Sequence, residues 1–231
     1  MVILKAFPIF RAFLQSDAFG KLILFSLFFF SVFAWSVILR KYLAFRAAQA
    51  ASRTFRKMYR KQSDDPVQLV EGDVYFDECP FFEVANRALG SLHDELERRG
   101  ANPGRTVTQA TVEAIEKGLD RTISDETLKL ERGLSLLATA ASACPLIGLL
   151  GTVWGVLIAF QRVADEASAQ IHVISQGISV ALSTTVVGLL VAIPSMVMYN
   201  WMTGIIRRFE TEMESFASEV LEDIERRYVE T

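Results

Sequence analysis

The chain has 231 residues, of which 51% are hydrophobic and 22% are charged, and its net charge is −3. Such a composition requires apolar segments that are separated from charged, water-exposed ones, and it gives no sign of a basic nucleic-acid binder. The chain has two cysteines and two histidines, and their spacing matches no metal-binding pattern. We therefore expect no metal site, no cofactor and no nucleic-acid partner.

Three charge-free apolar stretches dominate the sequence, over residues 22–39, 133–161 and 173–206. An uncharged apolar run of about 18 residues or more is long enough for a helix to cross the hydrocarbon core of a bilayer. No strand-length alternation of apolar and polar residues competes with the helical patterns between the stretches. The sequence therefore predicts an all-α integral membrane protein, with three transmembrane helices and long helical extensions into the cytoplasm.

The segments expected along the chain follow from these stretches and their flanks. They are an interfacial helix over 1–20, a first transmembrane helix over 21–41, a cytoplasmic helical domain over 42–132, a second transmembrane helix over 133–162, a periplasmic hairpin over 163–172, a third transmembrane helix over 173–206 and an amphipathic tail helix over 207–231. Within the cytoplasmic domain, apolar periodicity predicts helices over 80–99 and 106–132. The second of these leads directly into the second transmembrane helix.

The distribution of basic residues predicts the orientation. Eight lysines and arginines follow the first stretch, between residues 40 and 61. The connection between the second and third stretches contains a single one, Arg162. By the positive-inside rule, the N-terminus and the hairpin are periplasmic, and the C-terminus is cytoplasmic.

Small and hydroxyl residues form one helical face in each of the last two stretches. In the second stretch they are Ala141, Cys144, Pro145, Gly148, Thr152, Gly155 and Ala159, and in the third they are Gly177, Ala181, Thr184 or Thr185, Gly188 and Ala192. One interpretation is close helix packing, because small residues let backbones approach each other in lipid. The other is that buried hydroxyls, above all those of Thr152 and Thr185, contact an ion, water or a partner's carboxylate. We expect these faces to find their partners in neighbouring subunits of a ring.

The same stretches resemble a known family. The segment ACPLIGLLGTVWGVLIAF, from Ala143 to Phe160, and the segment from Gly177 to Asn200 are similar to the second and third spans of the TolQ/ExbB family. Residues 21–40 are similar to the first span of its TolQ branch. The resemblance thus extends over nearly the whole chain.

The resemblance implies a pentameric ring in the bacterial inner membrane. The ring would surround two copies of a single-span TolR/ExbD-type partner, use an ion gradient and energise a TonB- or TolA-like protein. By the resemblance, Thr152 and Thr185 match the family's pore-lining threonines, with Ser183 and Thr184 as neighbouring hydroxyls, and the further motif residues are Pro145, Trp154, Pro194, Asn200 and Glu131. Five residues of the small-residue faces are expected to pack helices: Gly148, Gly155, Gly177, Ala181 and Gly188.

One position departs from the family pattern. Val180 stands three residues after Gly177, where TolQ and ExbB proteins have a glutamate. A carboxylate inside a span is costly and usually functional, so its loss removes a candidate proton relay. The alternative function is therefore a non-conducting scaffold of the same fold that only packs a partner helix. An enzyme is not expected, because the second and third stretches contain no acidic residue and the chain has no phosphate-binding loop.

Overall fold

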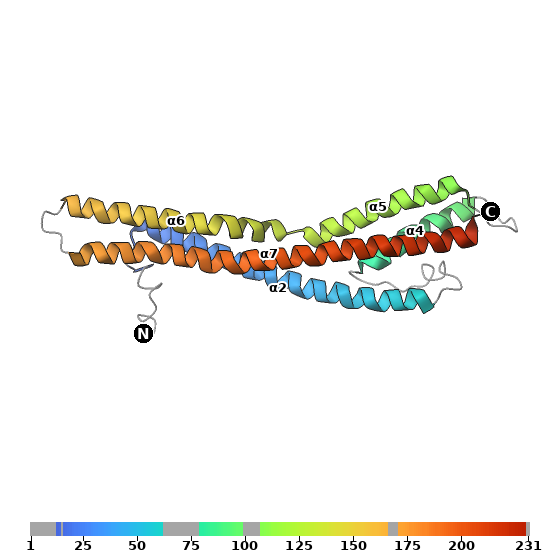
Figure 1. Cartoon of the computed structure of the whole chain (residues 1–231), viewed down its shortest axis with the longest axis horizontal. Coiled ribbons are helices and arrows are strands. Elements are labelled where there is room, and N and C mark those ends of the chain that lie inside the picture. Colours follow the sequence, from blue (N-terminus) through green and yellow to red (C-terminus); the bar gives the residue numbers. More distant parts are fainter. Residues whose placement is uncertain (1–12, 15, 62–78, 99–106, 166–170, 230–231) are drawn as a thin grey trace. The chain divides into compact units, whose positions relative to one another are not determined.

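The computed structural model describes residues 13–14, 16–61, 79–98, 107–165 and 171–229. Within them the elements are α2 (Ala18–Lys61), α4 (Pro80–Arg98), α5 (Gln109–Glu131), α6 (Leu134–Asp165) and α7 (Ile171–Tyr228), as Figure 1 shows. These described segments contain no strand, only an isolated bridge between Val107 and Val229. The predicted all-α fold is confirmed. The interfacial helix expected over 1–20 and the tip of the hairpin expected over 163–172 fall mostly outside the described residues.

Three of these helices, α2, α6 and α7, are long and apolar enough to cross a membrane. The mean hydropathy of their most apolar windows is 2.5, 2.1 and 2.1, respectively. With 44 and 58 residues, α2 and α7 are much longer than the roughly 20 residues that one crossing requires. Each therefore continues beyond its apolar part as a charged helix, and the tail expected over 207–231 forms the end of α7.

A turn separates α5 from α6, so the expectation that the helical pattern over 106–132 leads directly into the second span is wrong. Arg132 leaves the helical conformation with φ −52° and ψ 122°, although its amide still donates to the Leu128 carbonyl. Gly133 follows with φ +88°. This left-handed conformation is open to glycine and strained for other residues, so Gly133 ends the helix.

The chain divides into two compact units. We call Met1–Arg40 with Gly133–Met202 the apolar unit, and Lys41–Arg132 with Thr203–Thr231 the polar unit. In the apolar unit, the buried cluster joins α2, α6 and α7 through Ile23, Leu27, Ala140, Cys144, Val191 and Ala192. Helix α2 begins after Asp17, whose carboxylate accepts a hydrogen bond of 3.0 Å from the Gly20 amide. Asp17 is thus the N-cap of α2.

The polar unit has a core like that of a water-soluble protein. Buried apolar side chains of α2, α4, α5 and α7 form one cluster. At its centre the ring of Phe216 packs against three others, with centroid distances of 6.1 Å to Phe55, 5.1 Å to Tyr59 and 5.6 Å to Phe81. Such aromatic pairs add about 0.5–1.5 kcal/mol each to the effect of buried area. The charged parts of α2 and α7 therefore pack with α4 and α5 around a hydrophobic core of their own.

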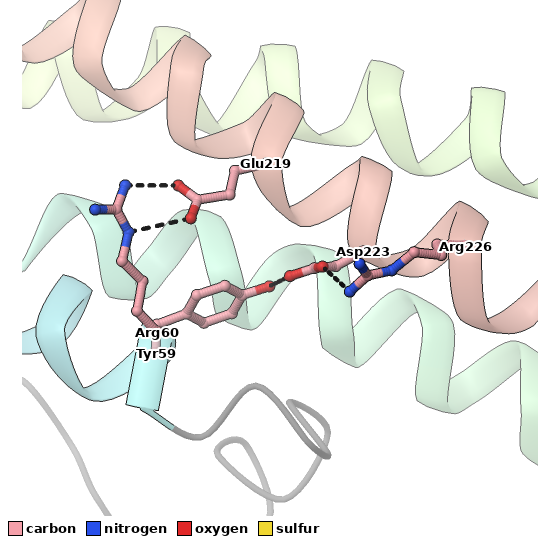
Figure 2. A network of polar contacts seen from close by, with 5 residues as sticks. All are labelled: Tyr59, Arg60, Glu219, Asp223 and Arg226. Atoms are coloured by element: carbon pink, nitrogen blue, oxygen red, sulfur yellow. Dashed lines mark hydrogen bonds and ion pairs between the residues drawn. The ribbon is translucent and has the colours of Figure 1, made fainter.

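Polar contacts hold the end of α2 against α7 in this unit, as Figure 2 shows. Arg60 donates two hydrogen bonds, of 3.2 and 3.3 Å, to the carboxylate of Glu219. The Tyr59 hydroxyl donates to Asp223, which also accepts a hydrogen bond from Arg226. The Arg60 pair is exposed, so solvent screens it and it contributes little to stability. Its main effect is to fix which faces of the two helices meet.

Candidate functional site

Helices α6 and α7 approach each other closely in the apolar unit because glycines face each other along the contact. A Cβ atom on Gly188 would lie 2.5 Å from the Cys144 carbonyl oxygen, and one on Gly148 would lie 2.9 Å from the Thr184 carbonyl oxygen. Farther along the contact, a Cβ on Gly155 would lie 2.7 Å from that of Ala181. Only glycine leaves room for this backbone approach, as in other membrane helix pairs.

The same contact corrects the expected partner of the small-residue faces. Both faces were expected to contact neighbouring subunits, but in the structure they pack against each other within one chain. Gly177 extends the pairing, since a Cβ there would lie 2.9 Å from the Ala159 side chain. Gly151, which sequence analysis did not single out, belongs to the same contact and faces Thr184. Its three-residue spacing from Gly148 was the available signal.

Threonine hydroxyls converge on one backbone carbonyl in the middle of this contact. The Gly148 carbonyl oxygen lies 3.2 Å from the hydroxyl of Thr152, 3.1 Å from that of Thr184 and 3.0 Å from that of Thr185. The Ala181 carbonyl is a second acceptor, 3.3 Å from Thr152 and 2.7 Å from Thr184. We call Thr152, Thr184, Thr185 and these two carbonyls the hydroxyl cluster.

The hydroxyls of Thr152 and Thr185 also hydrogen-bond to each other. A hydroxyl has one proton and two lone pairs, so only one of the two can donate within the pair at any moment. If Thr152 donates to Thr185, then Thr185 donates to the Gly148 carbonyl; in the opposite direction, Thr152 donates to Gly148 or Ala181. Both arrangements keep the protons bonded and leave lone pairs on both hydroxyl oxygens for a further donor or cation.

Burial separates the four hydroxyl residues that sequence analysis grouped together. Thr152 and Thr185 are half-buried, whereas Thr184 is only 2% exposed and lies between the helices. Thr184 therefore packs between α6 and α7 within the chain. This position differs from the expectation that its side chain lines a pore. Ser183 donates to the Ser179 carbonyl of its own helix. It lies two residues from Thr185, about 200° around the helix, and so belongs to another face.

Val180, where the resemblance led us to expect a glutamate, is half-buried one helical turn before Thr184. Its side chain brings no charge and no hydrogen-bonding group to the α6–α7 contact. Among the described residues, no group of three or more histidine, cysteine or acidic side chains could hold a metal ion.

Trp154 connects α6 to the beginning of α2. Its indole nitrogen donates a hydrogen bond of 2.8 Å to the Asp17 carboxylate, and its ring lies 4.5 Å from that of Phe19. Asp17 was not among the expected site residues. It lies 137 residues from Trp154, and the periodicity of apolar residues does not show which distant residues are in contact. The only signals were a carboxylate five residues before the first apolar stretch and an indole N–H donor within the second stretch.

The remaining motif residues lie outside the hydroxyl cluster. Pro145 and Pro194 are half-buried inside α6 and α7, where each removes one helical hydrogen bond. Asn200 is exposed on α7, and Glu131 is exposed as the last residue of α5.

Comparisons with known proteins identify relatives of this chain. Residues 89–215 match the profile of the MotA/TolQ/ExbB proton channel family. The Tol-Pal system protein TolQ of Pseudomonas aeruginosa is 30% identical over 212 residues, which cover 85% of each chain. TolQ of Haemophilus influenzae is 27% identical over 90% of this chain and 89% of its own, and the biopolymer transport protein ExbB of Xanthomonas campestris is 27% identical over 80% and 73%.

Proposed function

Because the chain belongs to the MotA/TolQ/ExbB proton channel family, we propose that it is the ring-forming subunit of an ion-driven motor in the bacterial inner membrane. In this proposal a pentamer surrounds a single-span TolR/ExbD-type partner and energises a TonB- or TolA-like protein. The names of its relatives, in the Tol-Pal system and in biopolymer transport, support this role. The N-terminus lies in the periplasm, and the polar unit lies in the cytoplasm.

The observation that supports an ion-handling role best is the half-buried pair of Thr152 and Thr185. Their hydroxyls lie in the uncharged parts of α6 and α7, hydrogen-bond to each other and can reverse the direction of that bond. A protonated aspartate of the partner's span, or a cation, would find acceptor lone pairs on both hydroxyl oxygens there. In this role Thr152 and Thr185 line the pathway, whereas Thr184 holds the helices together behind them.

The second candidate function is a non-conducting scaffold, and two observations favour it. Val180 supplies no carboxylate, and every hydroxyl in the cluster already has an acceptor within the chain. Packing alone is then a sufficient role for the threonines. The scaffold would bind the same single-span partner without coupling to an ion gradient.

Three threonine-to-valine variants distinguish the two functions. Thr152→Val, Thr185→Val and Thr184→Val keep the side-chain shape and remove one hydroxyl each, which costs about 0.6–2 kcal/mol for a contact between membrane helices. Each variant is produced with its single-span partner. Native mass spectrometry of the purified complex measures assembly, and proton uptake into proteoliposomes measures coupling.

A motor predicts that the Thr152 and Thr185 variants assemble normally but lose most proton uptake. Thr184→Val serves as the matched control, since it removes a buried hydroxyl from the same cluster and is expected to lower thermal stability while keeping uptake. A scaffold predicts that no variant changes the uptake of an assembled complex, and that result would defeat the motor. Val180→Glu adds a gain-of-function arm: a carboxylate beside the pathway makes the rate of uptake depend on pH.

A further inference from the structure

A cavity of about 230 Å³ lies between α2 and α7 in the polar unit. Its lining residues recur every three or four positions on each helix, so they form one face of α2 and one face of α7. Three of them are arginines, Arg53, Arg56 and Arg208, and one, Glu212, is acidic. The lining is therefore net positive.

The three guanidinium groups differ in what neutralises them. Arg56 is held by an ion pair of 3.0 Å with Glu212, and it lies 5.2 Å from the centre of the Phe81 ring. Arg53 and Arg208 are exposed, and neither forms an ion pair with any carboxylate in the described parts of the chain. Both guanidinium groups line the same cavity, so an anion bound there would be attracted to both of them.

The size and chemistry of the cavity define the anion. Pockets for drug-sized ligands measure roughly 300–1,000 Å³, so this cavity suits a smaller group. Two of its lining residues, Ser52 and Phe209, are buried, with 4% and 7% of their surface exposed. Paired guanidinium groups match the oxygen geometry of phosphate. We propose that the cavity binds a phosphate group between Arg53 and Arg208, with Arg56 held beside it by Glu212.

Two sources present this chemistry: an anionic phospholipid head group and a soluble phosphate. Trp201 is exposed on α7, and such aromatic side chains are enriched at the level of the lipid head groups. Arg208 follows seven residues later, about 10 Å along the helix. Basic pockets next to membrane helices bind anionic head groups. The experiment therefore has one arm for each source.

Both arms use the purified full-length chain. In the lipid arm, its unfolding temperature is compared in nanodiscs of phosphatidylcholine alone and in an equal mixture of phosphatidylcholine and phosphatidylglycerol. In the soluble arm, the chain in neutral detergent is titrated with inorganic phosphate against chloride at matched ionic strength. The test variant is Arg53→Gln with Arg208→Gln. The control is Lys57→Gln with Arg207→Gln, which removes one exposed charge from each helix outside the cavity.

We expect phosphatidylglycerol, inorganic phosphate or both to raise the unfolding temperature of the wild type and of the control. The test variant should weaken binding roughly tenfold or more, since two charged hydrogen-bond donors are lost. Glu212→Gln should tighten binding, because it frees Arg56 to donate to the anion. The proposal is overturned if neither source stabilises the chain, or if the control loses the effect as fully as the test variant.

Discussion

Adjacent residues on α7 have opposite roles because the helix turns by about 100° per residue. Thr184 is 2% exposed and packs against Gly151, whereas the neighbouring Thr185 is half-buried and bonded to Thr152. The sequence motif presents both as equivalent hydroxyls. Their difference depends on where α6 lies, which the third stretch alone does not encode.

The glycines of the α6–α7 contact give the first prediction. Gly188→Ala places a Cβ 2.5 Å from the Cys144 carbonyl oxygen, so the helices must separate, at a cost of about 1–3 kcal/mol. Because the contact lies within one chain, we expect lower stability of the monomer itself, measured by thermal unfolding in detergent. Gly204→Ala is the control, since no atom lies within 4 Å of its added Cβ, and helix propensity favours alanine by about 1 kcal/mol. Equal destabilisation by both changes would contradict the packing role.

Cys79 gives a second prediction. Burial disfavours the thiolate and raises the pKa of this thiol. The neutral thiol thus adds stability below the unfolded-state pKa of about 8.5, and this contribution is lost as pH rises through the higher folded-state pKa. In a Cys144→Ala background, maleimide labelling at pH 7 should be slow and should accelerate at alkaline pH or in denaturant. An exposed cysteine from Ser124→Cys is the reference, and equally fast labelling of both sites in the native protein would refute the burial.

At the scale of elements, apolar periodicity locates the helices but not their exact ends. The pattern over 80–99 corresponds to α4 (Pro80–Arg98), because every third or fourth residue enters the core of the polar unit. The pattern over 106–132 continues into the next apolar stretch without a visible break. The backbone conformations of Arg132 and Gly133 create the break, and periodicity does not detect them.

Gly133 gives a third prediction. Alanine at φ +88° is strained by roughly 1–2 kcal/mol, although nothing lies within 4 Å of the added Cβ. We therefore expect Gly133→Ala to lower the unfolding temperature. Gly90→Ala is the matched comparison, because it adds the same atom in open space inside α4 and should raise stability by up to about 1 kcal/mol. The idea fails if the two substitutions shift the unfolding temperature in the same direction.

For the whole molecule, the sequence predicts the membrane character and the family but not the internal pairing of its spans. The length of the uncharged apolar stretches is sufficient to identify α2, α6 and α7 as candidate membrane spans. The small-residue faces were assigned to other subunits because stripes on single helices contain no information about which helix covers them. The structure pairs them within the chain. The subunits of the proposed ring therefore meet through other surfaces. The ring itself is proposed because the chain belongs to the family.

Orientation is the last prediction. Basic residues follow the first stretch and are nearly absent between the second and third, so the positive-inside rule places the end of α6 in the periplasm and α5 in the cytoplasm. In a background with Cys79→Ala and Cys144→Ala, single cysteines at exposed Ala164 and exposed Ser124 report on these two sides. A membrane-impermeant maleimide applied to spheroplasts should label Ala164→Cys at once, and Ser124→Cys only after the membrane is opened. The reverse pattern would invert the topology and remove the polar unit from the cytoplasm.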